Sequence, residues 1–250
     1  MFHSIFFFAY APTLAISAAI FAVGSYLLGS VNFSIILSKI FLKKDIREMG
    51  SGNAGATNML RSAGKTAGVL TLLLDAAKCV AAVLPARFFY LAYSPGIDGG
   101  PGPELCLWAQ WGAYLAGFCC MMGHIFPVYF KFKGGKGVVT MATTAALVDW
   151  RVFLICLGVF MIVFAASRMV SLSSILGAAA YPVATFCMTF FLDCRPWVIF
   201  EEDYIPHVLI STTITCIGAV VIIVKHRSNI KRILNGTEKK ISFKKSKTTA

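Results

Sequence analysis

Charged side chains are scarce in this sequence. Asp, Glu, Lys and Arg make up 14% of its 250 residues, whereas a typical soluble domain carries roughly 25%. Hydrophobic residues make up 58%, which is more apolar surface than a soluble fold of this length could keep from water. The composition therefore excludes a soluble enzyme and a disordered scaffold, and it predicts an integral membrane protein.

Two further absences narrow the class of protein. The 8 cysteines include no C-x-x-C pair, and the 11 acidic residues are scattered. We therefore expect no metal and no cofactor. Six of the cysteines lie inside apolar runs, and we interpret them as small buried hydrophobic residues: Cys79, Cys119, Cys120, Cys156, Cys187 and Cys216.

Long apolar runs are present instead. A helix needs about 20 apolar residues to cross a bilayer, and six runs approach or exceed that length: 13–40, 66–92, 105–130, 152–167, 170–192 and 206–224. The first run lacks a basic flank and continues unbroken to about Ile40, so we interpret it as a retained helix and not as a signal peptide. A shorter run at 137–149 is either a short seventh span or a re-entrant helix buried in the bundle.

The charges of the connecting segments favour seven spans. Segments 43–65 and 131–136 are basic, whereas 93–104 and 193–204 are acidic. With seven spans these signs alternate between the two sides, which places the N-terminus outside and the C-terminus in the cytoplasm. The prediction is thus an all-α polytopic bundle of about seven transmembrane helices, one of them short. It forms a single domain over 1–238, followed by a basic cytoplasmic tail at 239–250.

The net charge of +12 fits this topology, so we expect membrane lipid and no nucleic acid as a partner. No obligate protein partner is evident in the sequence.

Three polar stretches fall on the predicted cytoplasmic side. The first runs from Gly50 to Asn58 and is followed by Arg61. Its glycines let backbone N–H groups face a ligand, its short polar side chains add donors, and Arg61 adds a planar fork suited to phosphate. A plain surface loop is the alternative interpretation.

The second stretch runs from Gly123 to Thr140. In it, Gly134, Gly135 and Gly137 bracket Lys136 just before the short apolar run. Free N–H groups at a helix start favour an anion, and Lys136 would add a full charge. Attraction to anionic lipid would need the lysines but not the glycines, so we favour an anion site.

The third stretch, from His226 to Glu238, begins where the last span ends. On a helix, His226, Asn229 and Arg232 share one face, which could point back at the other two stretches. Asp75 and Lys78 lie inside the second span, three residues apart, and we favour a structural ion pair there.

These stretches resemble the three motifs of the acyl-phosphate-dependent glycerol-3-phosphate acyltransferases, the PlsY family. They read SGNAGATN from Ser51, GHIFPVYFKFKGGKGVVT from Gly123 and HRSNIKRILNGTE from His226. The resemblance covers about Gly29 to Glu238. Asn32 departs from it, standing where proline or serine is more usual, and segments 93–104 and 193–204 look like additions on the outer face.

The resemblance implies an enzyme of the bacterial inner membrane with its active site on the cytoplasmic side. It would transfer a fatty acyl group from acyl phosphate to the 1-hydroxyl of glycerol 3-phosphate, giving lysophosphatidic acid and phosphate for phospholipid synthesis.

Both substrates carry a phosphate, and the polar stretches supply many anion donors. We expect the catalytic residues to be Ser51, Arg61, Lys136, His226 and Asn229. We expect the substrate- and phosphate-binding residues to be Gly52, Asn53, Thr57, Asn58, His124, Gly134, Gly135, Gly137, Thr140, Arg232, Asn235 and Glu238. His124 is also a candidate general base.

Two rival functions use similar features. A transporter for a small phosphorylated anion could use the same glycines and cations, but the outer halves of the spans contain little charge. A CDP-alcohol phosphatidyltransferase would need clustered aspartates for its metal, and this chain has none. The chain also lacks a G-x-S-x-G nucleophile elbow, which makes acyl transfer by positioning and charge stabilisation the favoured mechanism.

Overall fold

The described part of the chain is helical. The structure is a computed structural model that describes residues 2–92, 103–193 and 204–241. The long helices are α1 (Phe2–Ser30), α4 (Lys65–Ala92), α5 (Pro103–Ile125), α7 (Trp150–Ser167), α8 (Val170–Cys187) and α9 (Tyr204–Lys225). The shorter elements are α2 (Phe33–Leu42), η1 (Ile46–Glu48), α3 (Ala56–Ser62), η2 (Val128–Phe130), α6 (Val138–Val148), η3 (Met188–Asp193) and α10 (Arg227–Leu234).

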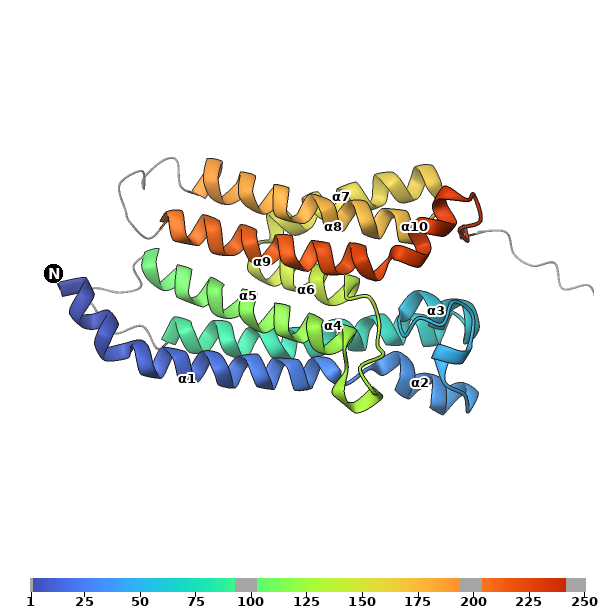
Figure 1. The fold of residues 1–250 in the computed structure, drawn as a ribbon, viewed down its shortest axis with the longest axis horizontal. Helices are drawn as coiled ribbons and strands as arrows, with labels where there is room; N and C mark the ends of the chain where they lie inside the picture. The colour runs from blue at the N-terminus through green and yellow to red at the C-terminus, as the bar shows by residue number, and fades with distance from the viewer. Residues whose placement is uncertain (1, 93–102, 194–203, 242–250) are drawn as a thin grey trace, which may run out of the picture.

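The helices form a membrane bundle, as the composition predicts. Six helical segments of the described chain are long and apolar enough to cross a membrane, and α6 is a shorter apolar helix among them. One group of helices consists of α1, α4 and α5, and the other consists of α7, α8 and α9, with α6 in contact with both (Figure 1). The predicted additions at 93–104 and 193–204 lie almost wholly outside the described residues.

Glycine brings α1 and α5 into close contact. A Cβ atom on Gly29 would overlap the Cys120 carbonyl, and one on Gly123 would overlap the Tyr26 carbonyl. Without a hydrophobic effect to draw helices together in lipid, such small residues let two backbones approach and gain dispersion energy. The second polar stretch, which follows Gly123, is thereby fixed against the end of α1.

The short helix α6 starts inside the bundle. It has 11 residues, and at 1.5 Å per residue it is about 16 Å long, roughly half the hydrocarbon thickness. The loop before it has already entered the bundle, because a Cβ atom on Gly137 would lie 2.8 Å from Met121 Cγ of α5. Just beyond α6, the Arg151 guanidinium pairs with the Asp193 carboxylate at 2.8 Å. Asp193 is the last residue of η3, which continues from the C-terminal end of α8. This placement agrees with a short seventh crossing.

The first apolar run is not one unbroken helix, which corrects the sequence prediction. The helix stops at Ser30, and Asn32 caps α2, with its side-chain oxygen accepting from the Ile35 amide at 3.2 Å and the Ser34 hydroxyl at 2.6 Å. The break leaves backbone carbonyls without helical partners. The Lys78 ammonium donates to two of them, at 3.0 Å to Gly29 and 2.7 Å to Val31.

The predicted pair inside the second span is confirmed. Lys78 Nζ lies 2.9 Å from an Asp75 carboxylate oxygen, and both side chains are buried. A buried charge is costly unless it is paired and hydrogen-bonded. Here the ion pair and two backbone carbonyls together satisfy the ammonium.

The cysteine interpretation is only partly confirmed. All six are free thiols, and Cys79 and Cys120 are buried, but Cys187 and Cys216 are exposed on the surface of the bundle. An outward-facing position in a spanning helix is apolar because it meets lipid. Sequence hydrophobicity alone therefore does not separate a buried cysteine from a lipid-facing one.

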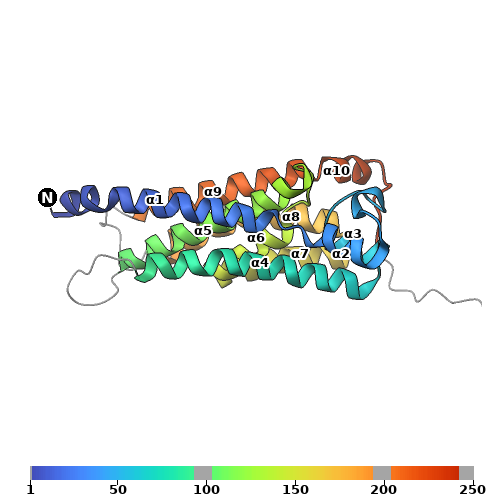
Figure 2. The same cartoon turned by 90° about the horizontal axis from the view of Figure 1, so that it is seen from below.

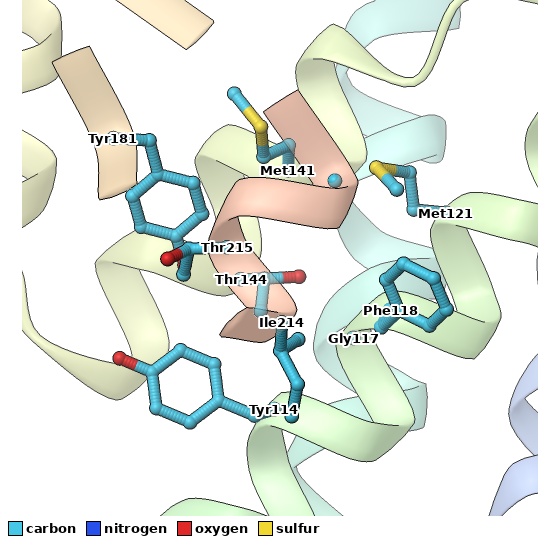
Figure 3. A pocket seen from close by; sticks show the side chains of 10 residues that line it. Tyr114, Gly117, Phe118, Met121, Met141, Thr144, Tyr181, Ile214 and Thr215 are labelled. Atoms are coloured by element: carbon cyan, nitrogen blue, oxygen red, sulfur yellow. The ribbon is translucent and has the colours of Figure 1, made fainter. Parts of the chain in front are cut away.

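A small cavity of about 20 Å³ lies between α5, α6, α8 and α9 (Figure 3). It is lined by Tyr114, Gly117, Phe118, Met121, Met141, Thr144, Tyr181, Ile214, Thr215 and Gly218. A cavity of this size has room for about one water-sized group. It cannot hold a fatty acyl chain as it stands.

Two glycines that line this cavity should respond oppositely to alanine. A Cβ atom on Gly218 would meet only Met121 Cε at 3.6 Å, whereas one on Gly117 would overlap Thr144. Because alanine favours a helix over glycine by about 1 kcal/mol, Gly218→Ala should raise the thermal unfolding midpoint in detergent. Gly117→Ala should lower it, and equal midpoints would contradict this packing.

Candidate active site

The three polar stretches lie at one end of the bundle. Helix α2 precedes the first stretch, α3 contains its last residues, and α10 belongs to the third stretch. These three helices stand together at that end in two perpendicular views (Figures 1 and 2). The connection from α5 to α6, which carries the second stretch, turns at the same end. Segments more than 150 residues apart in sequence, from Arg61 to Lys239, are in direct contact there.

The first stretch is a loop folded around Asn58. The side-chain oxygen of Asn58 accepts from the Ser51 amide at 3.0 Å, and its NH₂ group donates to the Ile46 and Met49 carbonyls at 3.1 and 2.9 Å. Gly50 has φ +60, and a Cβ atom there would overlap Asn58. The loop therefore needs glycine at this position, and the Asn58 amide hydrogens serve the loop itself.

Arg47 fastens the first stretch to the second. Its guanidinium pairs with Asp45 at 2.8 Å and donates to the Phe130 and Lys133 carbonyls at 2.9 and 3.1 Å. The Arg47 guanidinium lowers the pKa of Asp45, chiefly through their side-chain hydrogen bond. The planar, fixed donor geometry of arginine suits such a clamp better than a lysine would.

The glycine loop lies on the end of α5. The amides of Gly134 and Gly135 donate to the Ile125 and His124 carbonyls at 3.2 and 3.1 Å. A Cβ atom on Gly135 would overlap His124 Nε2 and approach the Ala54 carbonyl. The other ring nitrogen of His124, Nδ1, lies 3.1 Å from Lys78 Nζ. The His124 ring is thus enclosed between the glycine loop and the buried ion pair.

Lys136 reaches across to the third stretch. Its ammonium donates to the side-chain oxygen of Asn229, and the side-chain NH₂ group of Asn229 donates to Glu238 Oε1 at 2.7 Å. Arg232 Nε donates to the other Glu238 oxygen at 2.7 Å. The predicted shared face of His226, Asn229 and Arg232 is therefore turned toward Lys136 and Glu238.

Positive charge dominates this cluster. The pKa of Lys136 is lowered to about 8, first because its ammonium is largely buried and then because Arg232, Arg61 and Lys225 add positive charge nearby. Glu238 opposes this shift. An anion among these cations would find a strongly favourable potential.

His226 is neutral at physiological pH. Burial first, and then the charge of Lys136, lower its pKa to about 4. Its Nδ1 lies 2.8 Å from the Ile222 carbonyl, which can only accept, so the proton is on Nδ1 and Nε2 is free to accept.

The other predicted site residues differ in their accessibility. Ser51, Gly52, Arg61 and Asn235 are exposed, and Asn53 and Thr57 are half-buried. The Arg61 guanidinium donates to the Lys239 carbonyl at 3.3 Å. Thr140 is buried and donates to the Gly137 carbonyl at 2.9 Å, so its hydroxyl serves the start of α6.

Two residues of this site escaped the sequence analysis. Ser171, at the start of α8, donates to Glu238 at 2.7 Å, and Arg47 forms the clamp described above. Arg47 stands three residues before Gly50, and this closeness to the first stretch could have indicated its role in the sequence. No local pattern marks Ser171, because its partner lies 67 residues away.

Comparison with known proteins identifies the family. The profile described as "Glycerol-3-phosphate acyltransferase" matches residues 19–236. The glycerol-3-phosphate acyltransferase of Macrococcus caseolyticus is 39% identical over 88% of this chain and 95% of its own. That of Clostridioides difficile is 38% identical over 92% and 98%.

A crystal structure of PlsY (YgiH), an integral membrane glycerol 3-phosphate acyltransferase in its glycerol 3-phosphate form, matches with a TM-score of 0.68 and 32% identity. The match covers 90% of this chain and 96% of that one. The lysophosphatidic acid form matches with a TM-score of 0.64.

The profile match covers the first and second polar stretches and most of the third, up to residue 236. The fold and site thus define a multi-pass membrane acyltransferase. The chain belongs to the glycerol-3-phosphate acyltransferase family.

Arg47→Ala should weaken the enzyme by loosening the clamp. The substitution frees two carbonyls of the second stretch and leaves Asp45 unpaired. We expect acyltransferase activity to fall by about tenfold, since small displacements of positioning groups are costly. Lys44→Ala, an exposed cation three residues earlier, is the matched control and should keep full activity. Equal activities of the two variants would contradict the role of the clamp.

Proposed function

We propose that this protein transfers a fatty acyl group from acyl phosphate to the 1-hydroxyl of glycerol 3-phosphate, without metal or cofactor. The hydroxyl oxygen attacks the acyl carbon, the bond from that carbon to the phosphate oxygen breaks, and the products are lysophosphatidic acid and inorganic phosphate. The PlsY structures obtained with glycerol 3-phosphate and with lysophosphatidic acid support this choice of acceptor and product.

The observation that carries the proposal is the uncompensated positive charge at one end of the bundle. Arg232, Arg61 and Lys225 each act on Lys136 as positive charges, and Glu238 acts on it as a negative charge. Glu238 already accepts three hydrogen bonds, two of them from neutral groups. The remaining positive charge suits reactants that both carry a phosphate.

We assign Lys136 to one phosphate and Arg61 with Ser51, Gly52, Asn53 and Thr57 to the other. The amides of Gly134 and Gly135 are not free for an anion, contrary to the sequence prediction, because they donate to carbonyls at the end of α5. These glycines therefore position Lys136. Lys136 stands beside Asn229 and would hold its phosphate with one of its remaining hydrogens. Charge accumulates on the leaving phosphate during the reaction, so fixed cations stabilise the transition state more than the bound substrates.

The proton of the attacking hydroxyl goes to a phosphate oxygen in this mechanism. His226 has a free Nε2, but a group with a pKa of about 4 is a weak base at neutral pH. Acyl phosphate is a mixed anhydride with a good leaving group, so a strong base is unnecessary. His226 then accepts a hydrogen bond and orients the acceptor.

We propose that the site end faces the cytoplasm of a bacterial inner membrane. The basic tail and basic connecting segments support the cytoplasmic side, by the positive-inside rule. Glycerol 3-phosphate would arrive from water, and the acyl chain of the donor would stay among the lipid-facing helices.

Loss of either central cation should abolish transfer. Lys136→Ala and Arg61→Ala should each lower activity by about a hundredfold or more, as expected for removing charge stabilisation from a transition state. Lys131→Ala, an exposed lysine in the same connection as Lys136, should stay active. The measurement is product formation by purified protein, with unfolding midpoints to confirm folding. Near-normal activity in either variant would remove that residue from the site.

The donor can be tested separately. Purified protein given palmitoyl phosphate and glycerol 3-phosphate should form lysophosphatidic acid and release phosphate in equal amounts, because one phosphate leaves for each acyl group transferred. Palmitoyl-CoA should give no product under the same conditions. Turnover with the thioester alone would overturn the proposed donor.

A further inference from the structure

Glu238 lies at the centre of a buried hydrogen-bond network that reaches outside the three polar stretches. The Glu238 side chain is 4% exposed. Oε1 accepts from Ser171 and Asn229, both at 2.7 Å, and Oε2 accepts from Arg232 at 2.7 Å. Ser171 belongs to α8, so this contact ties the third stretch to a membrane helix.

The network fixes which way Asn229 points. An asparagine side chain can present either its oxygen or its NH₂ group to a neighbour. Glu238, as a carboxylate, can only accept, so the NH₂ group of Asn229 must face it. The Asn229 oxygen is thereby turned to Lys136, where it accepts from the ammonium.

From this geometry we infer that Ser171 and Glu238 are positioning residues, which set the orientation of Asn229 and through it the place and charge of Lys136. The inference rests on the proposed function only for its effect on activity. Ser171 and Arg232 hold the carboxylate from two sides, so Glu238 cannot rotate toward a substrate. A second tie close by, from the Ile241 amide to the Arg168 carbonyl at 2.9 Å, holds the chain after Glu238 against the start of α8.

The Glu238 carboxylate also affects the protonation of Lys136. Of the charged groups around its ammonium, Arg232, Arg61 and Lys225 lower its pKa, whereas Glu238 raises it. His226 is neutral and adds no charge. Replacing the Glu238 carboxylate with a neutral amide therefore lowers the pKa of Lys136 below its present value of about 8. More of the amine is then uncharged at neutral pH.

The first test compares variants of α8. Ser171→Ala should lower kcat/KM for glycerol 3-phosphate by about tenfold, as expected for a group that positions others, and Ser171→Thr should restore it by keeping the hydroxyl. Ser173→Ala is the matched control, because that buried hydroxyl donates to the carbonyl of Met169, the residue that caps its own helix. Equal values for Ser171→Ala and Ser173→Ala would overturn the inference.

The second test follows Lys136 itself, without substrates. The rate at which acetic anhydride labels Lys136, read by mass spectrometry across pH, reports the pKa of its amine. Glu238→Gln should shift this labelling curve to lower pH, and the alkaline limb of its kcat/KM profile should shift in the same direction. An unshifted labelling curve would overturn the inference.

The two tests separate the inference from the proposed function. If the Lys136→Ala variant proved active, the phosphate-binding role of Lys136 would be wrong. The labelling curve would still test whether Ser171 and Glu238 position Lys136. If Glu238→Gln does not fold, the labelling curve of Ser171→Ala decides it, because a released carboxylate loosens Asn229 and changes the environment of Lys136. A curve identical to that of Ser173→Ala would then count against the network.

Discussion

The buried ammonium of Lys78 holds together the parts of this bundle on which its site depends. In lipid, every charge and every free backbone carbonyl must find a partner inside the protein. Lys78 meets this constraint by pairing with Asp75 and donating to the Gly29 and Val31 carbonyls, which the break between α1 and α2 leaves free. The break lets the chain turn into α2 and lead into the first polar stretch.

The same ion pair also supports the second stretch. His124 lies against Lys78 through Nδ1, and its other ring nitrogen faces Gly135. The glycine loop therefore rests on a ring that is itself fixed by buried charges. Removing Lys78 would leave a carboxylate and two carbonyls unsatisfied at once. Breaking a buried ion pair therefore costs more stability than the intact pair contributes. A cation deep in the bundle thus positions a site at its end.

The sequence predicts the helices well and their interruptions poorly. Hydrophobic runs place α4, α7, α8 and α9 within a few residues of their observed bounds, because a span must be both long and apolar. The break at Asn32 does not appear in a hydropathy pattern, since the group that satisfies it comes from another helix. Charge alternation likewise predicts that the polar stretches share one end of the bundle, but not the Ser171 contact, which depends on how α8 packs against the chain after α10.

The central claim is that cations from separate stretches of the chain form one pocket for phosphate. A structure of the purified protein determined with bound glycerol 3-phosphate tests it most directly. The account predicts that the phosphate lies within hydrogen-bond distance of Arg61 or of Lys136, at one of the two positions proposed for the substrates. A phosphate bound elsewhere on the bundle, in contact with neither of these side chains, would contradict the account.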